Sequence, residues 1–161
     1  MLKPLYAVLL LTGTGLGLAA CSDGSDTPVE EAAPEDNSGL AITNGRMMLP
    51  PVAGNPAAVY FDIAYDGDAE ATLASAYVEG AERAELHDMS ESGGSMTMGE
   101  MAPLALQPGE SASFEPGGRH VMAFDLSPEL VAGGTTEVTL TLASGDKHSF
   151  EAEIRSAGDA R

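Results

Sequence analysis

Short alternating runs of apolar and polar residues, separated by turn signals, constrain the fold of this chain more than any other feature. Residues 59–65 (VYFDIAY) and 136–142 (TEVTLTL) alternate with a period of two, which is typical of strands with one buried face. Glycine, proline and aspartate interrupt the pattern at 66–68 (DGD), 116–118 (PGG) and 144–146 (SGD). No stretch has the longer period of an amphipathic helix. We therefore predict an all-β domain, either a β-sandwich or a barrel.

Two segments at the N-terminus are expected to lie outside this domain. Residues 1–20 carry Lys3 and then the apolar run 5–18, which together predict a signal peptide. The sequence LAAC, which ends at Cys21, resembles the lipobox of bacterial lipoproteins, in which the cysteine carries the lipid. Residues 21–38 are acidic and rich in proline, serine and glycine, so we expect a lipidated cysteine followed by a flexible tether.

Two other interpretations of the leader are a plain secretory signal with a chance cysteine and a single membrane-spanning helix. The apolar run is shorter than the about 20 residues of a spanning helix, and three glycines interrupt it. Ser22 stands where an aspartate would resemble an inner-membrane retention signal, which favours the outer membrane. We expect a periplasmic lipoprotein held to the membrane by its lipid alone, with a folded domain at 39–156 and a short tail at 157–161.

The charge of the chain limits its partners. A formal net charge of −18 argues against nucleic acid and anionic lipid head groups, which would be repelled. The single cysteine, Cys21, excludes a disulfide within the chain and a thiolate metal cluster. No Ser-His-Asp order, nucleophile elbow or spaced carboxylate pair suggests catalysis, so we expect a protein that is not an enzyme.

Methionine and histidine are concentrated between residues 87 and 122. This window holds five of the eight methionines and two of the three histidines, and the pattern His-x-Met begins at both His87 and His120. Side chains two positions apart on a strand share a face, so each pair can present an imidazole and a thioether together. Neutral, soft thioethers suit Cu(I) better than zinc, magnesium or calcium. A blue-copper centre would need a cysteine thiolate, but the one cysteine is at the lipidation site. A structural zinc site normally has four nitrogen or thiolate ligands, and three histidines are too few.

The spacing of these residues resembles the motif H-x10-M-x21-H-x-M of the PCu(A)C family of periplasmic copper chaperones. Residues 116–122 (PGGRHVM) are similar to the Pro-Gly-Gly-x-His-x-Met signature of that family, and 85–89 (ELHDM) to its first ligand strand. The resemblance covers roughly residues 40–155. The metal ligands that it implies are His87, Met98, His120 and Met122.

This resemblance implies a cupredoxin-like Greek-key β-sandwich or barrel that binds Cu(I). It also implies delivery of copper toward the CuA centre of cytochrome c oxidase. The expected partners are copper donor and acceptor proteins, such as the CuA subunit or an Sco-type assembly factor. Met89 matches a methionine often found beside the first ligand and is a candidate auxiliary ligand. Some relatives carry a second copper site in a C-terminal extension rich in histidine and methionine, which the ending RSAGDAR does not resemble.

Two other functions remain open at this stage. A copper-sequestering protein for tolerance or storage would use the same ligands without a dedicated acceptor. A structural or adhesive β-sandwich would carry the methionines only incidentally. We expect Met47 and Met48 to pack in the core or on a strand surface, and His148 to be a solvated turn residue. The acidic residues around the ligands either form a solvated face or attract the ion: Glu85, Asp88, Glu91 and Glu100.

Overall fold

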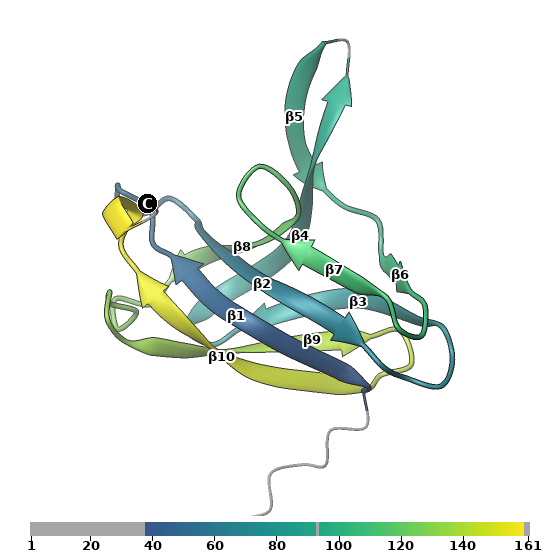
Figure 1. Cartoon of the computed structure of the whole chain (residues 1–161). Helices are drawn as coiled ribbons and strands as arrows, with labels where there is room; N and C mark the ends of the chain where they lie inside the picture. The colour runs from purple at the N-terminus through teal and green to yellow at the C-terminus, as the bar shows by residue number, and fades with distance from the viewer. Residues whose placement is uncertain (1–37, 93, 160–161) are drawn as a thin grey trace, which may run out of the picture. The chain divides into compact units, whose positions relative to one another are not determined.

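The computed structural model describes residues 38–92 and 94–159, and the regular elements of this part of the chain are strands, apart from one 3₁₀ turn (Figure 1). The all-β prediction is confirmed. None of the described residues forms a helix long and apolar enough to cross a membrane. The strands are β1 (Leu40–Met48), β2 (Ala57–Tyr65), β3 (Ala71–Val78), β4 (Ala81–Ser92), β5 (Ser95–Glu100), β6 (Leu104–Leu106), β7 (Ser111–Phe114), β8 (His120–Leu126), β9 (Thr135–Leu142) and β10 (Lys147–Arg155), and a short 3₁₀ turn spans Ala157–Asp159.

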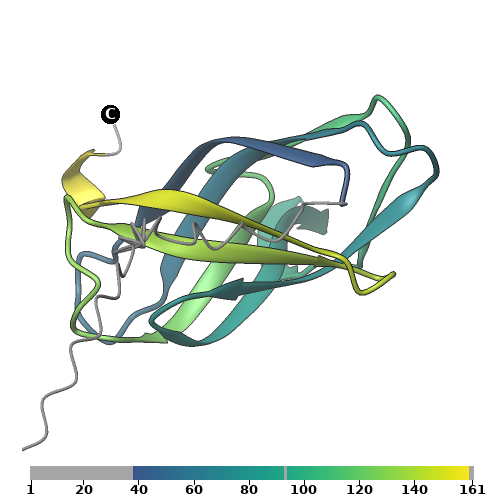
Figure 2. The ribbon, with the colours of Figure 1, turned by 90° about the horizontal axis from the view of Figure 1, so that it is seen from below.

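These strands form one hydrogen-bonded sheet that curls around its own core. Its order is β5-β4-β8-β2-β1-β10-β9-β3-β6, and β7 pairs with β2 off this path. The β1–β10 pair is parallel and the other ladders are antiparallel. Although β3 and β4 stand near opposite ends of this order, they contact one another. The sheet therefore curls back toward itself as an open, flattened barrel, which Figure 2 shows from below.

The core fills the inner face of this barrel because the strands alternate as the sequence predicts. On β2, Val59, Phe61 and Ile63 are fully buried. The ring of Phe61 stacks on that of Phe114 with centroids 4.5 Å apart, and it meets the ring of Phe150 at 5.1 Å. Burial of large apolar side chains is the main stabilising term in folding, at about 1.5–3 kcal/mol for each.

The same alternation determines which side chains of β8 face outward. Val121 and Ala123 are fully buried in the core, so the residues that alternate with them lie on the outer face of the sheet. These residues include His120 and Met122. The two candidate ligands of β8 are therefore free of the hydrophobic core, although His120 is itself covered and only 6% exposed.

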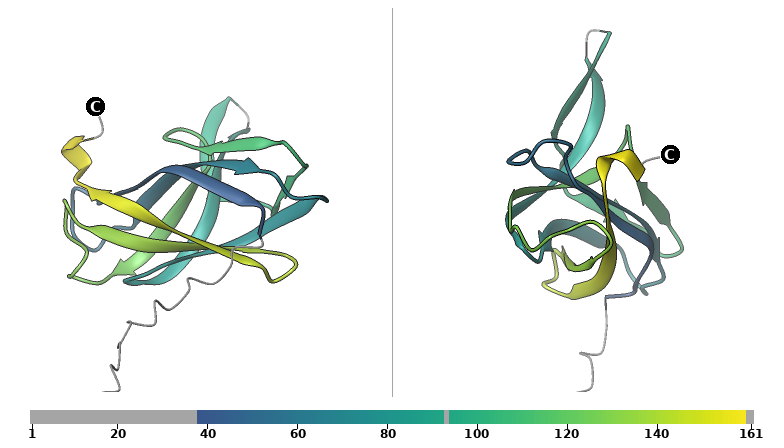
Figure 3. Two further views of the ribbon diagram at one scale, coloured as in Figure 1. Left: turned by 60° about the horizontal axis from the view of Figure 1, so that its bottom comes forward. Right: turned by 90° about the vertical axis from the view of Figure 1, so that its left-hand side faces the viewer.

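The β4–β5 hairpin projects from the barrel, as Figures 1 and 3 show. The chain reverses at Gly94, whose φ of 82° is a conformation that glycine adopts at little cost. The strand that follows this turn was not predicted from the sequence. All residues of β5 are exposed, and β5 is the first strand in the sheet order, so one of its edges has no neighbour among the described strands.

Three further predictions concern residues outside the candidate site. Met47 is fully buried and Met48 is half-buried, as expected. His148 lies in β10 opposite Leu140 and is half-buried. The prediction of a solvated turn residue is therefore wrong, because the turn ends at Asp146 and the returning strand begins directly after it.

The signal peptide predicted at 1–20 and most of the segment predicted at 21–38, including Cys21, lie outside the described residues. The lipid anchor and the tether therefore stay predictions.

Candidate metal centre

Two neighbouring strands bring the candidate histidines together. β4 and β8 pair antiparallel, with His87 directly opposite His120 and Glu85 opposite Met122. Opposed residues in such a pair lie on the same face of the sheet. The centroids of the two imidazole rings are 5.9 Å apart.

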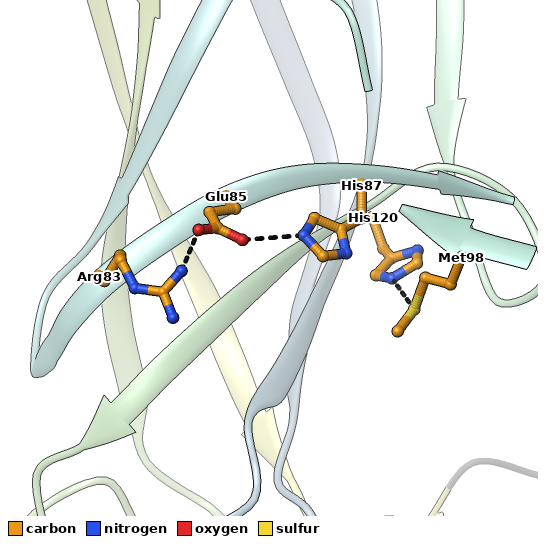
Figure 4. Close-up of polar contacts among 5 residues, drawn as sticks. All are labelled: Arg83, Glu85, His87, Met98 and His120. Carbon is orange, nitrogen blue, oxygen red and sulfur yellow. Dashed lines mark hydrogen bonds and ion pairs between the residues drawn. The ribbon is translucent and has the colours of Figure 1, made fainter. Parts of the chain in front are cut away.

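His120 has one nitrogen engaged and one that faces a sulfur atom. Its Nδ1 lies 2.9 Å from the carbonyl oxygen of Gly118. Because a carbonyl can only accept, Nδ1 carries the proton of the neutral ring, and Nε2 keeps its lone pair. That Nε2 lies 3.2 Å from Sδ of Met98 (Figure 4). A nitrogen lone pair thus faces a thioether, an arrangement that a soft cation between them would stabilise.

His87 is oriented by a carboxylate. Its Nε2 lies 3.0 Å from Oε2 of Glu85, so Nε2–H donates and Nδ1 keeps the lone pair of the neutral ring. Among the described residues, this Nδ1 is the one buried side-chain nitrogen or oxygen without a hydrogen-bond partner. A buried polar atom left unpaired is costly. A metal ion would satisfy it, and a carboxylate on the opposite nitrogen is the usual support of a metal-binding histidine.

A second contact supports the carboxylate itself. Arg83 forms an ion pair with Glu85 (Figure 4), and its guanidinium lies over the ring of Phe124, 3.8 Å from the centroid. The hydrogen bond from His87, assisted by Arg83, lowers the pKa of the Glu85 carboxyl. Glu85 therefore stays ionised at neutral pH and holds the His87 ring in place.

The other predicted ligands lie beside these two histidines on the same face. Met122 follows His120 by two positions on β8 and is half-buried. Met89 follows His87 by two positions on β4, is half-buried and stands directly opposite Met98 on β5. The structure thus gathers the four predicted ligands and the predicted auxiliary at the base of the β4–β5 hairpin.

The remaining wall of the site comes from β2 and from the loop before β8. The ring centroid of Tyr60 lies 6.2 Å from that of His120, and the guanidinium of Arg46 covers the Tyr60 ring at 5.2 Å. Burial raises the pKa of Tyr60, so its phenol stays neutral. Arg119 lies 3.9 Å from the carboxylate of Asp88 and so links this loop to β4.

Sequence reasoning missed the two residues that most directly surround the imidazoles. Glu85 was expected either to belong to a solvated acidic face or to attract the ion, but it contacts His87. The signal that could have identified it is its position two residues before His87, which places both on one face of a strand. Tyr60 has no local signal, because it reaches the site only through the pairing of β2 with β8.

The donor set consists of two imidazole nitrogens and neighbouring thioethers, all of them neutral. The described residues contain no group of three histidine, cysteine, aspartate or glutamate side chains placed to hold a metal ion. Hard cations that require several oxygen ligands therefore do not fit here. A soft ion that accepts nitrogen and thioether donors does.

Comparison with known sequences identifies one family. The family model described as "Putative lipoprotein LpqE-like" matches residues 40–154, which include both histidines and every methionine of the site. No curated protein sequence matches this chain.

Solved structures with a similar fold are PCuAC domains. The apo PCuAC domain of PmoF1 is 24% identical with a TM-score of 0.60, and covers 73% of this chain and 94% of its own length. The copper-bound PCuAC domain of PmoF2 is 18% identical with a TM-score of 0.60, and covers 73% and 93%. The Cu(I) form of DR1885 from Deinococcus radiodurans is 20% identical with a TM-score of 0.53, and covers 76% and 80%. These similarities confirm the predicted cupredoxin-like β fold.

Proposed function

Because this chain belongs to the LpqE-like family of lipoproteins, we propose that it is a lipid-anchored periplasmic protein that binds Cu(I) and passes it to an acceptor. The observation that carries this proposal is the state of the two imidazoles. Each has one nitrogen in a hydrogen bond, at Glu85 or Gly118, and the lone pairs that remain are on His87 Nδ1 and His120 Nε2. These two lone pairs lie on neighbouring rings, and one of them faces a thioether.

The thioethers indicate which metal this site selects. Met98 and Met122 add neutral, polarisable sulfur to two neutral nitrogens, which favours Cu(I) over Zn²⁺ and Cu(II). Two of the similar structures carry copper according to their names, the PCuAC domain of PmoF2 and Cu(I)-DR1885. Both share the fold of this chain at low sequence identity, so they support the proposal, while the donor set of this chain carries it.

The ion is cargo in this proposal and not a catalytic centre. Copper held by neutral ligands can be exchanged without a change of protonation. The acceptor that we propose is a protein on the route to the CuA centre of cytochrome c oxidase, either the CuA subunit itself or an Sco-type assembly factor. The predicted lipid on Cys21 would keep the domain at the periplasmic surface of a membrane, and we propose the outer membrane.

A competition titration of the mature protein tests this proposal. Under reducing, anaerobic conditions Cu(I) and Zn²⁺ are offered together, and we expect one Cu(I) per chain with little bound zinc. Zinc binding that equals or exceeds Cu(I) binding would overturn the assignment. Several tightly held ions that do not pass to a chelator would favour a copper-storage protein instead.

A further inference from the structure

We propose that the β4–β5 hairpin carries a second Cu(I) position made only of thioethers, formed by Met89, Met96 and Met98, through which the ion enters and leaves the histidine site. This inference rests on the proposed function, since it concerns the path to the same site. It assigns a role to Met96, which lies outside the set of ligands that the sequence motif implies.

The strand register places the three sulfurs on one face. Met89 stands directly opposite Met98, and Met96 precedes Met98 by two positions on β5. Opposed residues, and residues two apart on a strand, share a face, and diagonal neighbours are close enough for long side chains to meet. This face is continuous with the imidazoles, because His87 precedes Met89 by two positions on β4.

The exposure of these methionines calls for an explanation other than packing. The side chains of Met96 and Met98 are 59% and 48% exposed, on an edge strand with no buried residue. A single exposed apolar side chain is ordinary. Two exposed methionines beside a third thioether are unusual. They lie on an edge strand, where charged residues would better prevent association with other strands. β-branched residues suit a strand better than methionine does. The property that methionine adds to this surface is therefore its thioether sulfur.

Met98 connects the two positions because its Sδ already lies 3.2 Å from Nε2 of His120. An ion held by the two imidazoles, Met98 and Met122 can exchange both nitrogens and the sulfur of Met122 for the sulfurs of Met89 and Met96 while Met98 stays bound. Copper remains Cu(I) throughout, every donor is neutral, and no proton or electron moves. Because Met98 is shared, the chain holds one ion in either position and its stoichiometry stays at one.

The second position lies nearer to an incoming protein. Met96 is two residues closer to the hairpin turn than Met98, a rise of about 7 Å along the strand. The hairpin itself projects from the barrel (Figures 1 and 3), whereas His120 is only 6% exposed. An acceptor can therefore reach the thioethers on the hairpin without displacing the covered imidazole.

A variant without the histidine ligands isolates the second position. In His87→Gln/His120→Gln, labelled at the methionine methyl carbons, we expect Cu(I) to shift the methyl signals of Met89, Met96 and Met98. Adding Met96→Leu should weaken this binding by roughly tenfold, whereas adding Met101→Leu should not. Met101 is the matched control because it belongs to the same segment but is half-buried against the core. A folded double variant that shows no Cu(I)-dependent methyl shift would overturn the proposal.

Transfer kinetics provide a second test that leaves the histidines intact. The Cu(I)-loaded protein is mixed with a chromogenic Cu(I) chelator, and the rate of transfer is compared for the wild type, Met96→Leu and Met101→Leu. We expect Met96→Leu to slow transfer by roughly tenfold, with a much smaller change in Kd, and Met101→Leu to leave both unchanged. An unchanged rate in Met96→Leu would overturn the second position alone. Failure of the wild type to bind Cu(I) would overturn the proposed function as well.

Discussion

His87 and His120 occupy directly opposed positions on adjacent antiparallel strands, and the centroids of their rings lie 5.9 Å apart. The backbone ladder between β4 and β8 fixes this separation, and no loop has to close to create it. Each ring is held by its second nitrogen, one by the carboxylate of Glu85 and the other by the carbonyl of Gly118. The strand ladder and these two hydrogen bonds therefore position the nitrogen half of the site, which is the basis of the predictions that follow.

Removal of the carboxylate that orients His87 should weaken Cu(I) binding. Glu85→Gln keeps the size of the side chain but loses the charge that holds Nε2–H, and loss of such a supporting contact typically lowers metal affinity by about 10–100-fold. Competition with a Cu(I) chelator measures the affinity. Glu82→Gln, at an exposed position of the same strand, is the control and should bind as the wild type does.

Truncation of either predicted thioether ligand should lower Cu(I) affinity without loss of the fold. Met98 is 48% exposed and Met122 is half-buried on the outer face, so Met98→Ala and Met122→Ala leave the core intact. We expect a decrease of roughly tenfold or more in each variant, with circular dichroism spectra and urea midpoints close to those of the wild type. Unfolding of either variant would indicate that the methionine packs and does not bind.

Acid should release the ion. Both imidazoles must be neutral to bind, whereas thioethers do not take up protons. Protons therefore compete with copper as the pH falls, and the affinity should decrease in acid with up to two protons per ion. Chelator competition from pH 5 to 8 measures this profile. A flat profile would remove His87 and His120 from the ligand set, and a decrease that begins near pH 8 would indicate a thiolate.

The predicted lipid anchor should be separable from copper binding. Cys21→Ala removes the site of lipidation, so the protein should leave the membrane fraction or remain unprocessed. Because no predicted ligand is a thiolate, the Cu(I) affinity should not change. Membrane fractionation together with a titration of the purified variant tests both statements. Lost affinity in this variant would mean that Cys21 contributes to the site.

The stability of the domain should depend strongly on Phe61. This side chain is fully buried and stacks on Phe114 with centroids 4.5 Å apart. Phe61→Ala removes a large apolar volume and should decrease the free energy of unfolding by about 3–5 kcal/mol. Urea denaturation gives the value. Tyr77→Ala, at a side chain that is 54% exposed, should cost far less.

The parts of the structure that the sequence predicted are those that local periodicity determines. Period-two alternation predicts which residues of β2 and β9 face the core, and it places each histidine on one face with the methionine two positions later. The structure then brings His87, His120 and Met98 together, as the motif spacing implied. Their roles as ligands, like that of Met122, stay predictions.

The parts that the sequence did not predict depend on which strands become neighbours. Tyr60 meets His120 only because β2 pairs with β8, two strands that are distant in the chain. Glu85 shares a strand face with His87 because it stands two residues earlier, but that spacing alone did not show that its carboxylate contacts the imidazole. The strand after Gly94 was missed because its residues are all exposed, so they show no buried face to detect.

The two halves of the site differ in when their side chains become ordered. The imidazole of His120 is covered and hydrogen-bonded, so its rotational freedom is lost when the protein folds. The thioether of Met98 is 48% exposed, and a methionine side chain can lose up to about 2 kcal/mol of conformational entropy when it is immobilised. In the proposed site, that loss occurs when copper binds and is recovered when copper leaves. Release of the ion is therefore favoured entropically by the same exposed sulfurs that help to capture it.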